Sequence, residues 1–359
     1  MDFTFSPEQD ALRDAVRDTL AREAPSAYVR RMIDDEAGVS PELWSKLAEL
    51  GWLGLLIPEA HGGLGLGLVD AVVVQEEMGK LPFPGPYFSS AIFATVAARR
   101  LGATELLGGL ADGTTRGTVA LEELGHGDPI ERVRATADGD VLSGLKPAVP
   151  DGHNADWVIV AARTDDGLGS FLLERPGGEL VPSLDVTRKV ARLDLAGRRA
   201  RRIGPPGDHT AIWRRVADDA AVALCAVTVG VCERALQLGV DYAKQRVQFG
   251  RPLASFQVIK HKAVDMLHAT ELARVGTHYA AWTSDADDSH REMAAAMAKG
   301  YVGEAAVFVT AEDIQIHGGV GFTWDADPHL FYRRAKANDV LLGQQAWQRQ
   351  RLADLILSR

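Results

Sequence analysis

The sequence predicts an α+β protein in which a β domain is inserted between two helical regions. Helical patterns with capping signals occupy the first third, and short β-rich runs separated by glycine-rich turns follow. Long apolar helical patterns occupy the remainder. We therefore expect an N-terminal helical domain over residues 1–114, a middle β domain over 115–206 and a C-terminal helical bundle over 207–359. A chain of 359 residues is long enough for two or three domains that share an extensive core.

Two helix starts can be predicted near the N-terminus. Ser6 is expected to be an N-cap, with Pro7 at the first helical position and an acidic residue in the first turn. The same arrangement recurs from Ser40, and Gly51 is expected to end that helix. The glycine-rich segment 57–67 follows a helix rather than a strand, so we expect it to be a turn and not a nucleotide-binding loop.

The β region and the last 150 residues follow different patterns. Asp-Gly, Gly-Leu-Gly and Pro-Gly-Gly turns separate the β-rich runs, and the arginine-rich stretch 197–202 is expected to be a solvated strand and loop. The segment 209–245 is apolar nearly all round, which predicts one helix of about 35 residues at the centre of a bundle. Further helices are expected at about 255–283, 288–316 and 328–341 and from about 344.

Charge, hydropathy and cysteine content exclude several classes of protein. A formal net charge of −10 argues against nucleic-acid binding, and no apolar run approaches the length of a membrane span. The polar, acidic N-terminus is not a signal peptide. Cys225 and Cys232 lie about 10 Å apart on one predicted helix, too far for a disulfide, so we expect buried thiols and a cytoplasmic location. The histidines show no metal-ligand spacing, so no metal centre is expected.

The stretch "RVQFGRPLASFQ" (246–257) can bind a ligand but carries no group for acid–base chemistry. Ser255 is expected to be the N-cap of the helix that follows. Arg246 and the amide of Gln248 have the chemistry to bind a diphosphate, and Phe249 to cover a ring. A helix-connecting loop with an ordinary salt bridge explains the same residues equally well.

Two further segments complete a family resemblance. One is "QIHGGVGFTWDADP" (315–328), in which paired glycines end a helix, and the other combines "LGWLGLLIPEAHGGLGL" (50–66) with "EEMGKLPFPGP" (76–86). With the Arg-x-Gln-Phe-Gly stretch, these segments resemble the FAD-dependent acyl-CoA dehydrogenases in type and order. The resemblance covers essentially the whole chain, including "VLSGLKPAVPDGHNADWVIVAART" in the β region.

The resemblance implies a fold, a reaction and a shared cofactor site. The family has an N-terminal helical domain, a middle β domain and a C-terminal four-helix bundle, and it assembles as a dimer of dimers. A glutamate removes the α proton of an acyl-CoA thioester while the β hydride passes to the flavin. One subunit supplies the ring pocket and this base, and its neighbour grips the diphosphate and adenosine. The cofactor-binding residues implied for the second role, here called the clamp, are Arg246, Gln248, Phe249, Gln257, Gln315, Gly318 and Gly319.

The positions that serve a subunit's own flavin ring depart from the family pattern. The family's Thr-Glu-x-x-x-Gly-Ser-Asp reads "EELGHGD" (122–128) here, with Glu122 in place of the threonine and no serine. The family's aromatic-Ile-Thr segment lies within "KPAVPDG" (146–152), where Ala148 and Pro150 take the aromatic and threonine positions. Proline offers neither an N–H nor a hydroxyl group to a flavin.

The position of the base departs as well. The family's Glu-Gly-Thr falls on Leu342, Gly343 and Gln344, and leucine cannot take up a proton. Some branches place the glutamate on the long helix, at or near Ala220 here. Asp219 is the alternative base at that place, although one residue along a helix turns a side chain by about 100°.

The residues that would hold a partner's FAD keep the family type, whereas those that would serve the chain's own flavin ring and base are lost. This contrast favours the non-catalytic subunit of a heteromeric α2β2 acyl-CoA dehydrogenase of actinobacterial type. Such a chain would complete the FAD site of a homologous catalytic subunit, on a bulky or steroid side-chain acyl-CoA, with an electron-transfer flavoprotein-type acceptor. Two alternatives stay open. One is a self-sufficient homo-oligomeric dehydrogenase, or a related flavin oxidase or hydroxylase, that uses Asp219. The other is a flavin-free scaffold or acyl-CoA-binding protein.

Overall fold

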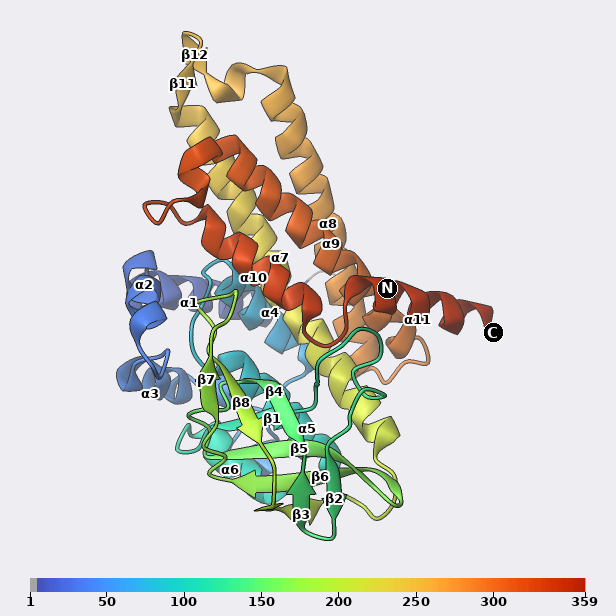
Figure 1. Cartoon of the computed structure of the whole chain (residues 1–359). Helices are drawn as coiled ribbons and strands as arrows, with labels where there is room; N and C mark the ends of the chain where they lie inside the picture. The colour runs from blue at the N-terminus through green and yellow to red at the C-terminus, as the bar shows by residue number, and fades with distance from the viewer. Residues whose placement is uncertain (1–4, 359) are drawn as a thin grey trace. The chain divides into compact units, whose positions relative to one another are not determined.

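The structure is a computed structural model that describes residues 5–358, and its elements follow the predicted order of helices, strands and helices (Figure 1). It divides into two compact units. The first unit contains the chain up to Val29, the segment Val72–Phe83 and the chain from Val222 onward. The second unit contains Arg30–Ala71 and Pro84–Ala221, and therefore all of the β region.

Helices fill the chain before the first strand, as the sequence predicts. Their bounds are α1 (Pro7–Glu23), α2 (Ser26–Asp34), α3 (Pro41–Glu49), α4 (Leu68–Gly79), the π-helical η3 (Tyr87–Ala94), α5 (Thr95–Leu101) and α6 (Leu107–Ala111). Ser6 caps α1 in a capping box, because its Oγ accepts from the N–H of Gln9 at 3.3 Å and its own N–H donates to the Gln9 side chain at 3.0 Å. Gly51, with φ of 75°, follows α3 as predicted.

The β region forms two sheets in the second unit. Its strands are β1 (Gly117–Ala120), β2 (Thr136–Asp138), β3 (Val141–Ser143), β4 (Leu145–Pro150), β5 (Trp157–Thr164), β6 (Gly167–Glu174), β7 (Glu179–Val181), β8 (Val190–Asp194), β9 (Arg198–Arg199) and β10 (Arg201–Ile203). The seven-stranded sheet runs β10-β6-β5-β2-β3-β9 with β1 parallel to β5, and the three-stranded sheet runs β4-β8-β7. Val158, Val160 and Phe171 lie in the hydrophobic core of this region.

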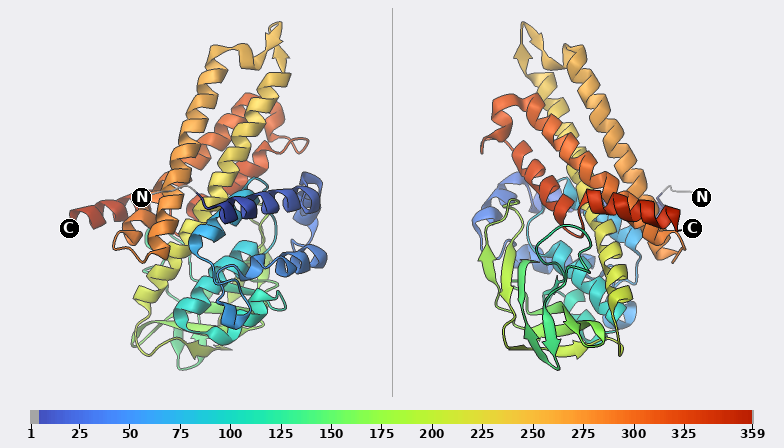
Figure 2. Two further views of the ribbon diagram at one scale, coloured as in Figure 1. Left: turned by 180° about the vertical axis from the view of Figure 1, so that it is seen from behind. Right: turned by 45° about the vertical axis from the view of Figure 1, so that its right-hand side comes forward.

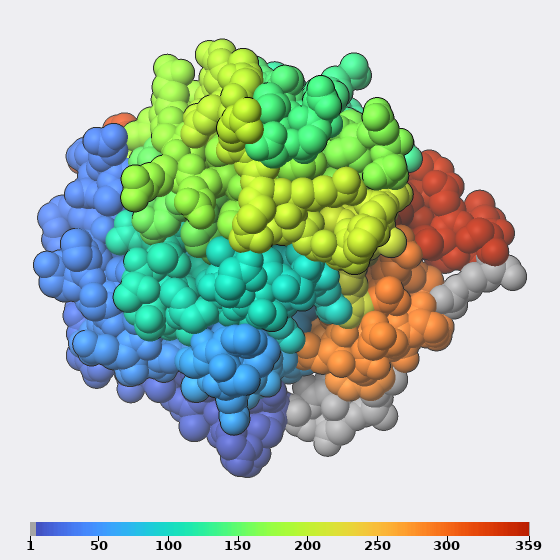
Figure 3. All heavy atoms as spheres, turned by 90° about the horizontal axis from the view of Figure 1, so that it is seen from below, coloured from blue at the N-terminus to red at the C-terminus, as the bar shows by residue number. Residues whose placement is uncertain are grey.

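The arginine-rich stretch 197–202 is solvated, as predicted. It forms the edge strands β9 and β10, and the segment around residue 200 lies at the surface in Figure 3. Arg199 pairs with Asp140 and Arg201 with Glu105, each at 2.8 Å and each more than half exposed. Ion pairs this exposed contribute little to stability, so the stretch has an ordinary surface role.

Five helices follow the β region. They are α7 (Thr210–Gln245), α8 (Gln257–Asp285), α9 (Arg291–His317), α10 (Pro328–Val340) and α11 (Gln345–Leu357). Within the first unit, α8 and α9 lie side by side in all three ribbon views (Figures 1 and 2). The predicted N-cap at Ser255 is wrong, because Ser255 ends the 3-10 turn η5 (Leu253–Ser255) and the extended Phe256 precedes α8.

The helix α7 is long and apolar enough to cross a membrane, so the expectation that no apolar run approaches that length is wrong. However, 72% of its most apolar window is buried inside the protein, which is typical of a core helix. Cys225 and Cys232 on this helix are buried free thiols, as expected, and burial raises the pKa of each to about 12.

In the first unit, α4 and α7 cross with their backbones in close contact. A Cβ atom on Gly79 would lie 2.0 Å from the carbonyl oxygen of Val227, and one on Gly230 would lie 2.0 Å from that of Glu76. Both distances are far inside van der Waals contact, so only glycine fits at either position.

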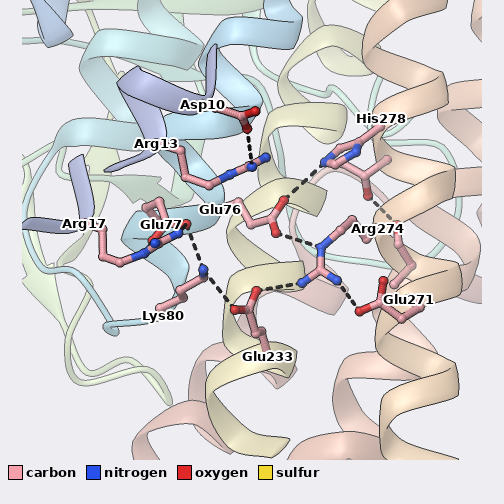
Figure 4. A network of polar contacts seen from close by, with 12 residues as sticks. Asp10, Arg13, Arg17, Glu76, Glu77, Lys80, Glu233, Glu271, Arg274 and His278 are labelled. Carbon is pink, nitrogen blue, oxygen red and sulfur yellow. Dashed lines mark hydrogen bonds and ion pairs between the residues drawn. The ribbon is translucent and has the colours of Figure 1, made fainter. Parts of the chain in front are cut away.

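Arg274 of α8 lies at the centre of a buried ionic network in the first unit (Figure 4). Its Nε donates to Glu76 of α4 at 2.8 Å, and its Nη2 donates to Glu233 of α7 at 2.6 Å. Nε2 of His278 lies 3.2 Å from the second oxygen of Glu76. Burial opposes ionisation of Glu76, but His278 and Arg274 outweigh burial and lower its pKa to about 2.

Lys80 extends the network toward α1. Its Nζ lies 2.7 Å from Glu77 and 2.9 Å from Glu233, and Arg17 of α1 lies 3.2 Å from Glu77. The network therefore connects α1, α4, α7 and α8.

Candidate functional site

The stretch that begins at Arg246 folds into a tight hairpin between α7 and α8. Strands β11 (Val247–Gln248) and β12 (Arg251–Pro252) pair antiparallel with Gln248 opposite Arg251. The two turn residues, Phe249 and Gly250, have φ of 54° and 77°. Positive φ at both central residues is the geometry of a type I′ turn, which matches the twist of paired strands.

Phe249 is unfavourable both in its backbone conformation and in its exposure to solvent. A positive φ is strained for a bulky side chain, and 91% of this apolar residue is exposed. Its ring meets the edge of Phe256 at a centroid distance of 6.2 Å, and Arg251 stacks on Phe256 at 4.1 Å. The hairpin thus projects an aromatic ring that the chain itself does not cover.

The polar side chains of the hairpin are also available. Arg246, Gln248 and Gln257 are exposed. Nε2 of Gln248 donates to the neighbouring carbonyl of Val247 at 2.9 Å, and Gln257 lies 3.4 Å from His261. No described residue forms an ion pair with the guanidinium of Arg246. These groups can therefore bind an anion without breaking a strong internal contact.

The second half of the clamp lies at the C-terminal end of α9. Gln315 is exposed, and Gly318 caps the helix at φ of 65°, with its N–H bonded to the carbonyls of Ile314 and Gln315. Within residues 5–358, no heavy atom outside the immediately neighbouring backbone lies within 4 Å of the Cβ position of Gly318 or Gly319. The backbone here is open to close approach by a ligand.

The structure brings the two halves of the clamp together in the first unit. His317, next to Gly318, stacks on Tyr242 of α7 at a centroid distance of 4.3 Å, and the carbonyl of Tyr242 accepts from the N–H of Arg246 at 2.8 Å. A cavity of about 130 Å³ lies beside them, lined by Gly239, Val240, Ala243, Lys244, Ala254, Ile259, Lys260, Ala263 and Ile316. A guanidinium, amides, an open Gly-Gly backbone and an aromatic ring suit a diphosphate joined to a planar ring system.

The segments expected beside a flavin ring lie in the second unit and are held by a pair that the sequence analysis missed. Nζ of Lys146, which is fully buried, donates to Glu123 at 2.8 Å and to the carbonyl of Leu121 at 3.0 Å. Burial lowers the pKa of Lys146 to about 8, although Glu123 acts in the opposite direction. This pair joins the loop after β1 to β4.

In neither segment does the local structure supply the hydroxyl or aromatic side chains that the family pattern places there. Glu122 lies 3.4 Å from Arg132, in an ion pair. Ala148 is exposed within an irregular stretch of β4, where the register with β8 shifts. Pro150 is buried, and its carbonyl accepts from Thr118 at 2.6 Å.

Leu342 lies in a tightly packed turn after α10 in the first unit. It is 1% exposed, has φ of 61°, and its carbonyl accepts from Nε2 of Gln348 at 3.1 Å. Just before it, the buried Nζ of Lys299 donates to the carbonyls of Asn338 and Asp339 at 3.0 and 2.9 Å. The segment is fixed by structural contacts, and Leu342 itself offers no proton acceptor in its side chain.

Asp219 lies in the second unit, between two arginines. Its Oδ2 accepts from Nη2 of Arg100 at 2.8 Å, and Arg215 lies 3.3 Å away one turn earlier on α7. Its carboxylate is buried, whereas Arg100 is partly exposed. Two ion pairs to guanidinium groups are the arrangement of a structural ion-pair residue rather than of a general base.

Comparison with known proteins gives a consistent result. Residues 6–105 match the family profile "Acyl-CoA dehydrogenase, N-terminal domain", and residues 214–357 match "Acyl-CoA dehydrogenase, C-terminal domain". The chain is 34% identical over 353 residues to acyl-CoA dehydrogenase IpdE2 of Mycolicibacterium smegmatis, covering 97% of this chain and 98% of that protein.

Solved structures of similar chains have the same fold. A variant of the Tcur3481-Tcur3483 steroid ACAD superposes with a TM-score of 0.89 at 34% identity, covering 98% of each chain. A chain of the ChsE4-ChsE5 complex from Mycobacterium tuberculosis superposes with a TM-score of 0.89 at 29% identity, covering 100% of each chain.

Proposed function

Because this chain belongs to the acyl-CoA dehydrogenase family, we propose that it is the non-catalytic subunit of a heteromeric enzyme that introduces an α,β double bond into an acyl-CoA thioester. One contrast carries the proposal. The clamp residues Arg246, Gln248 and Gln315 are exposed and available, whereas the apolar, buried Leu342 stands at the position of the base.

In this proposal the clamp completes an FAD site whose ring pocket and base belong to a homologous catalytic subunit. Arg246 and Gln248 bind the diphosphate, Phe249 covers a ring, and the open backbone at Gly318 and Gly319 admits the cofactor closely. Bound FAD supplies the hydride acceptor of the reaction. The strained, exposed Phe249 supports this assignment, because the isolated chain gains little packing from it beyond the edge of Phe256.

The same relatives support a proposal for the partners and the substrate. Two similar structures carry paired names, the Tcur3481-Tcur3483 steroid ACAD and the ChsE4-ChsE5 complex, which supports a heteromer of two homologous chains. We propose a bulky or steroid side-chain acyl-CoA as substrate, an electron-transfer flavoprotein-type acceptor and a cytoplasmic location.

Flavin stoichiometry tests the proposal. The chain is purified alone and co-expressed with a homologous acyl-CoA dehydrogenase subunit, and flavin absorbance is measured per chain. One FAD for every two chains, in the co-purified complex only, is the expected result. A yellow, active homo-oligomer of this chain with one FAD per chain contradicts it.

Substitution of Asp219 distinguishes the proposed non-catalytic subunit from a self-sufficient enzyme that uses Asp219 as its base. We expect Asp219→Asn to change the turnover of the complex by less than about twofold, because its carboxylate serves Arg100 and Arg215. Removal of a general base lowers turnover by about 10²- to 10⁴-fold. Steady-state rates decide between these outcomes, and thermal unfolding of the same variant controls for loss of the buried ion pair. A hundredfold loss in a folded variant favours the self-sufficient enzyme.

A glutamate restored at position 342 is not expected to restore a base. Leu342→Glu places a carboxylate at a position that is 1% exposed, so we expect a loss of about 2 kcal/mol or more of unfolding free energy. The matched control Leu342→Met keeps the volume and costs less than about 1.5 kcal/mol. Urea unfolding measures both. Dehydrogenase activity gained by the isolated Leu342→Glu chain would show that only this side chain was missing.

A further inference from the structure

His317 lies within the second half of the clamp, between Gln315 and Gly318. It is the last residue of α9, directly before Gly318, and its ring stacks on Tyr242 of α7. Tyr242 in turn holds the start of the hairpin, through the 2.8 Å bond from the N–H of Arg246 to its carbonyl. The imidazole therefore lies against the residue of α7 that holds the first residue of the hairpin.

Asp313 fixes which nitrogen of the imidazole carries a proton. Nδ1 of His317 lies 2.9 Å from the carboxylate Oδ1 of Asp313 and 2.9 Å from its backbone carbonyl. Because both neighbours are acceptors, Nδ1 is the protonated nitrogen. The side chain of Asp313 is fully buried, so this contact is well shielded from water.

The other nitrogen of His317 is left for a ligand. No described residue hydrogen-bonds to Nε2, and this atom is not buried. In a neutral imidazole protonated at Nδ1, Nε2 is an acceptor and would repel phosphate oxygens. In the imidazolium it is a charged donor, on the residue that directly precedes the open backbone at Gly318.

We propose that His317 is a further cofactor-binding residue of this chain, an imidazolium that presents Nε2–H to the diphosphate of the dinucleotide, with Asp313 as its positioning residue. The inference rests on the proposed function and names a residue outside the clamp. It makes binding of the dinucleotide depend on the protonation of one side chain.

The surrounding charges favour this state. Burial lowers the pKa of His317, but the hydrogen bonds and charge of Asp313 outweigh burial, so its pKa lies above the ordinary value. Burial raises the pKa of Asp313, and His317 acts against that rise. From α7, Tyr242 faces the ring and the charge of Arg234 acts on Asp313. The negative end of the α9 dipole favours a cation at its last turn.

The affinity for the diphosphate is expected to fall as the pH rises. A diphosphate bound to the imidazolium raises the pKa of His317 further, so binding takes up a proton. Affinity is therefore full below the pKa of the free protein and falls as the pH rises through it, by at most about tenfold per pH unit from this one group.

The test uses the co-purified complex, stripped of flavin and titrated with FAD between pH 6 and 9. We expect His317→Gln to weaken FAD binding about tenfold or more at the lower pH values, where one charge-assisted hydrogen bond is lost. We also expect it to remove the pH dependence of the wild type. Asp313→Asn should move the loss of affinity to lower pH. ADP should lose affinity in His317→Gln, whereas adenosine, which lacks the diphosphate, should not.

Two controls keep the outcomes separate. Thermal unfolding of the flavin-free complex reports a purely structural role of His317. Unchanged FAD affinity and an unchanged pH profile in His317→Gln overturn the inference, even if the variant unfolds at a lower temperature. The same titration can be run on whichever FAD-binding assembly contains this chain, so it does not require the heteromer. One FAD per chain in a homo-oligomer would contradict the proposed heteromer, but the role of His317 could still be tested. One FAD for every two chains, with no effect of His317→Gln, would contradict only the role of His317.

Discussion

Arg246→Ala is expected to remove most of the flavin from the co-purified complex. The exposed guanidinium forms no ion pair with any described residue, so its loss costs the fold little. A charge-assisted bond to a diphosphate contributes about 1.5–3 kcal/mol, so FAD binding should weaken about tenfold to hundredfold. Flavin absorbance per chain after gel filtration, and a titration of the flavin-free complex, measure the effect.

Arg251→Ala is the matched control, in the same hairpin. Its guanidinium stacks on Phe256 within the chain, so we expect flavin content close to that of the wild type. If Arg246→Ala leaves the flavin content of every complex unchanged, the flavin-free scaffold or acyl-CoA-binding protein becomes the better explanation.

Arg274→Ala is expected to be the most destabilising single substitution in the ionic network. It leaves the buried Glu76 and the partly buried Glu233 without their shared cation. Removing one partner of a buried pair costs about 3–5 kcal/mol, because the remaining charge stays desolvated. Urea unfolding of the purified protein measures the loss.

Glu271→Gln is the control for that substitution. Glu271 also pairs with Arg274 but is half exposed, so its neutralisation should cost less than about 1 kcal/mol. The lowered pKa of Glu76 adds a pH signature. Its contribution is present above the ordinary glutamate pKa and is lost as the pH falls toward about 2. Equal losses for Arg274→Ala and Glu271→Gln would mean that the network is not the main support of these helices.

Local signals in the sequence identify the helices because the determinants are themselves local. Ser6 and Gln9 satisfy each other's backbone groups within one turn, and the apolar character of residues 209–245 is enough to indicate a buried helix. The start of α8 is two residues later than expected because the hairpin and the turn η5 use the residues up to Ser255 before the helix begins.

Contacts between distant residues could not be predicted in this way. Lys146 and Glu123 are 23 positions apart, and Arg274 and Glu76 are 198 apart, so no periodic pattern links them. His317 could have been noticed, since it has an aspartate one turn earlier on the same helix face. Its stacking on Tyr242 depends on how α7 and α9 pack, which no single segment encodes.

The crossing of α4 and α7 has a consequence for how this chain can vary. Neither Gly79 nor Gly230 has a positive φ, so the restriction is one of distance alone. A methyl group at either position must push the two helices apart, which moves Glu76 of α4 relative to Glu233 of α7, the two carboxylates that share Arg274. Charge pairs require closer registration than apolar side chains do, so such a variant should lose its ionic contacts before its hydrophobic core. The two glycines thus set the distance between α4 and α7. A substitution at either position is expected to be tolerated only together with changes among the charged residues whose alignment depends on that distance.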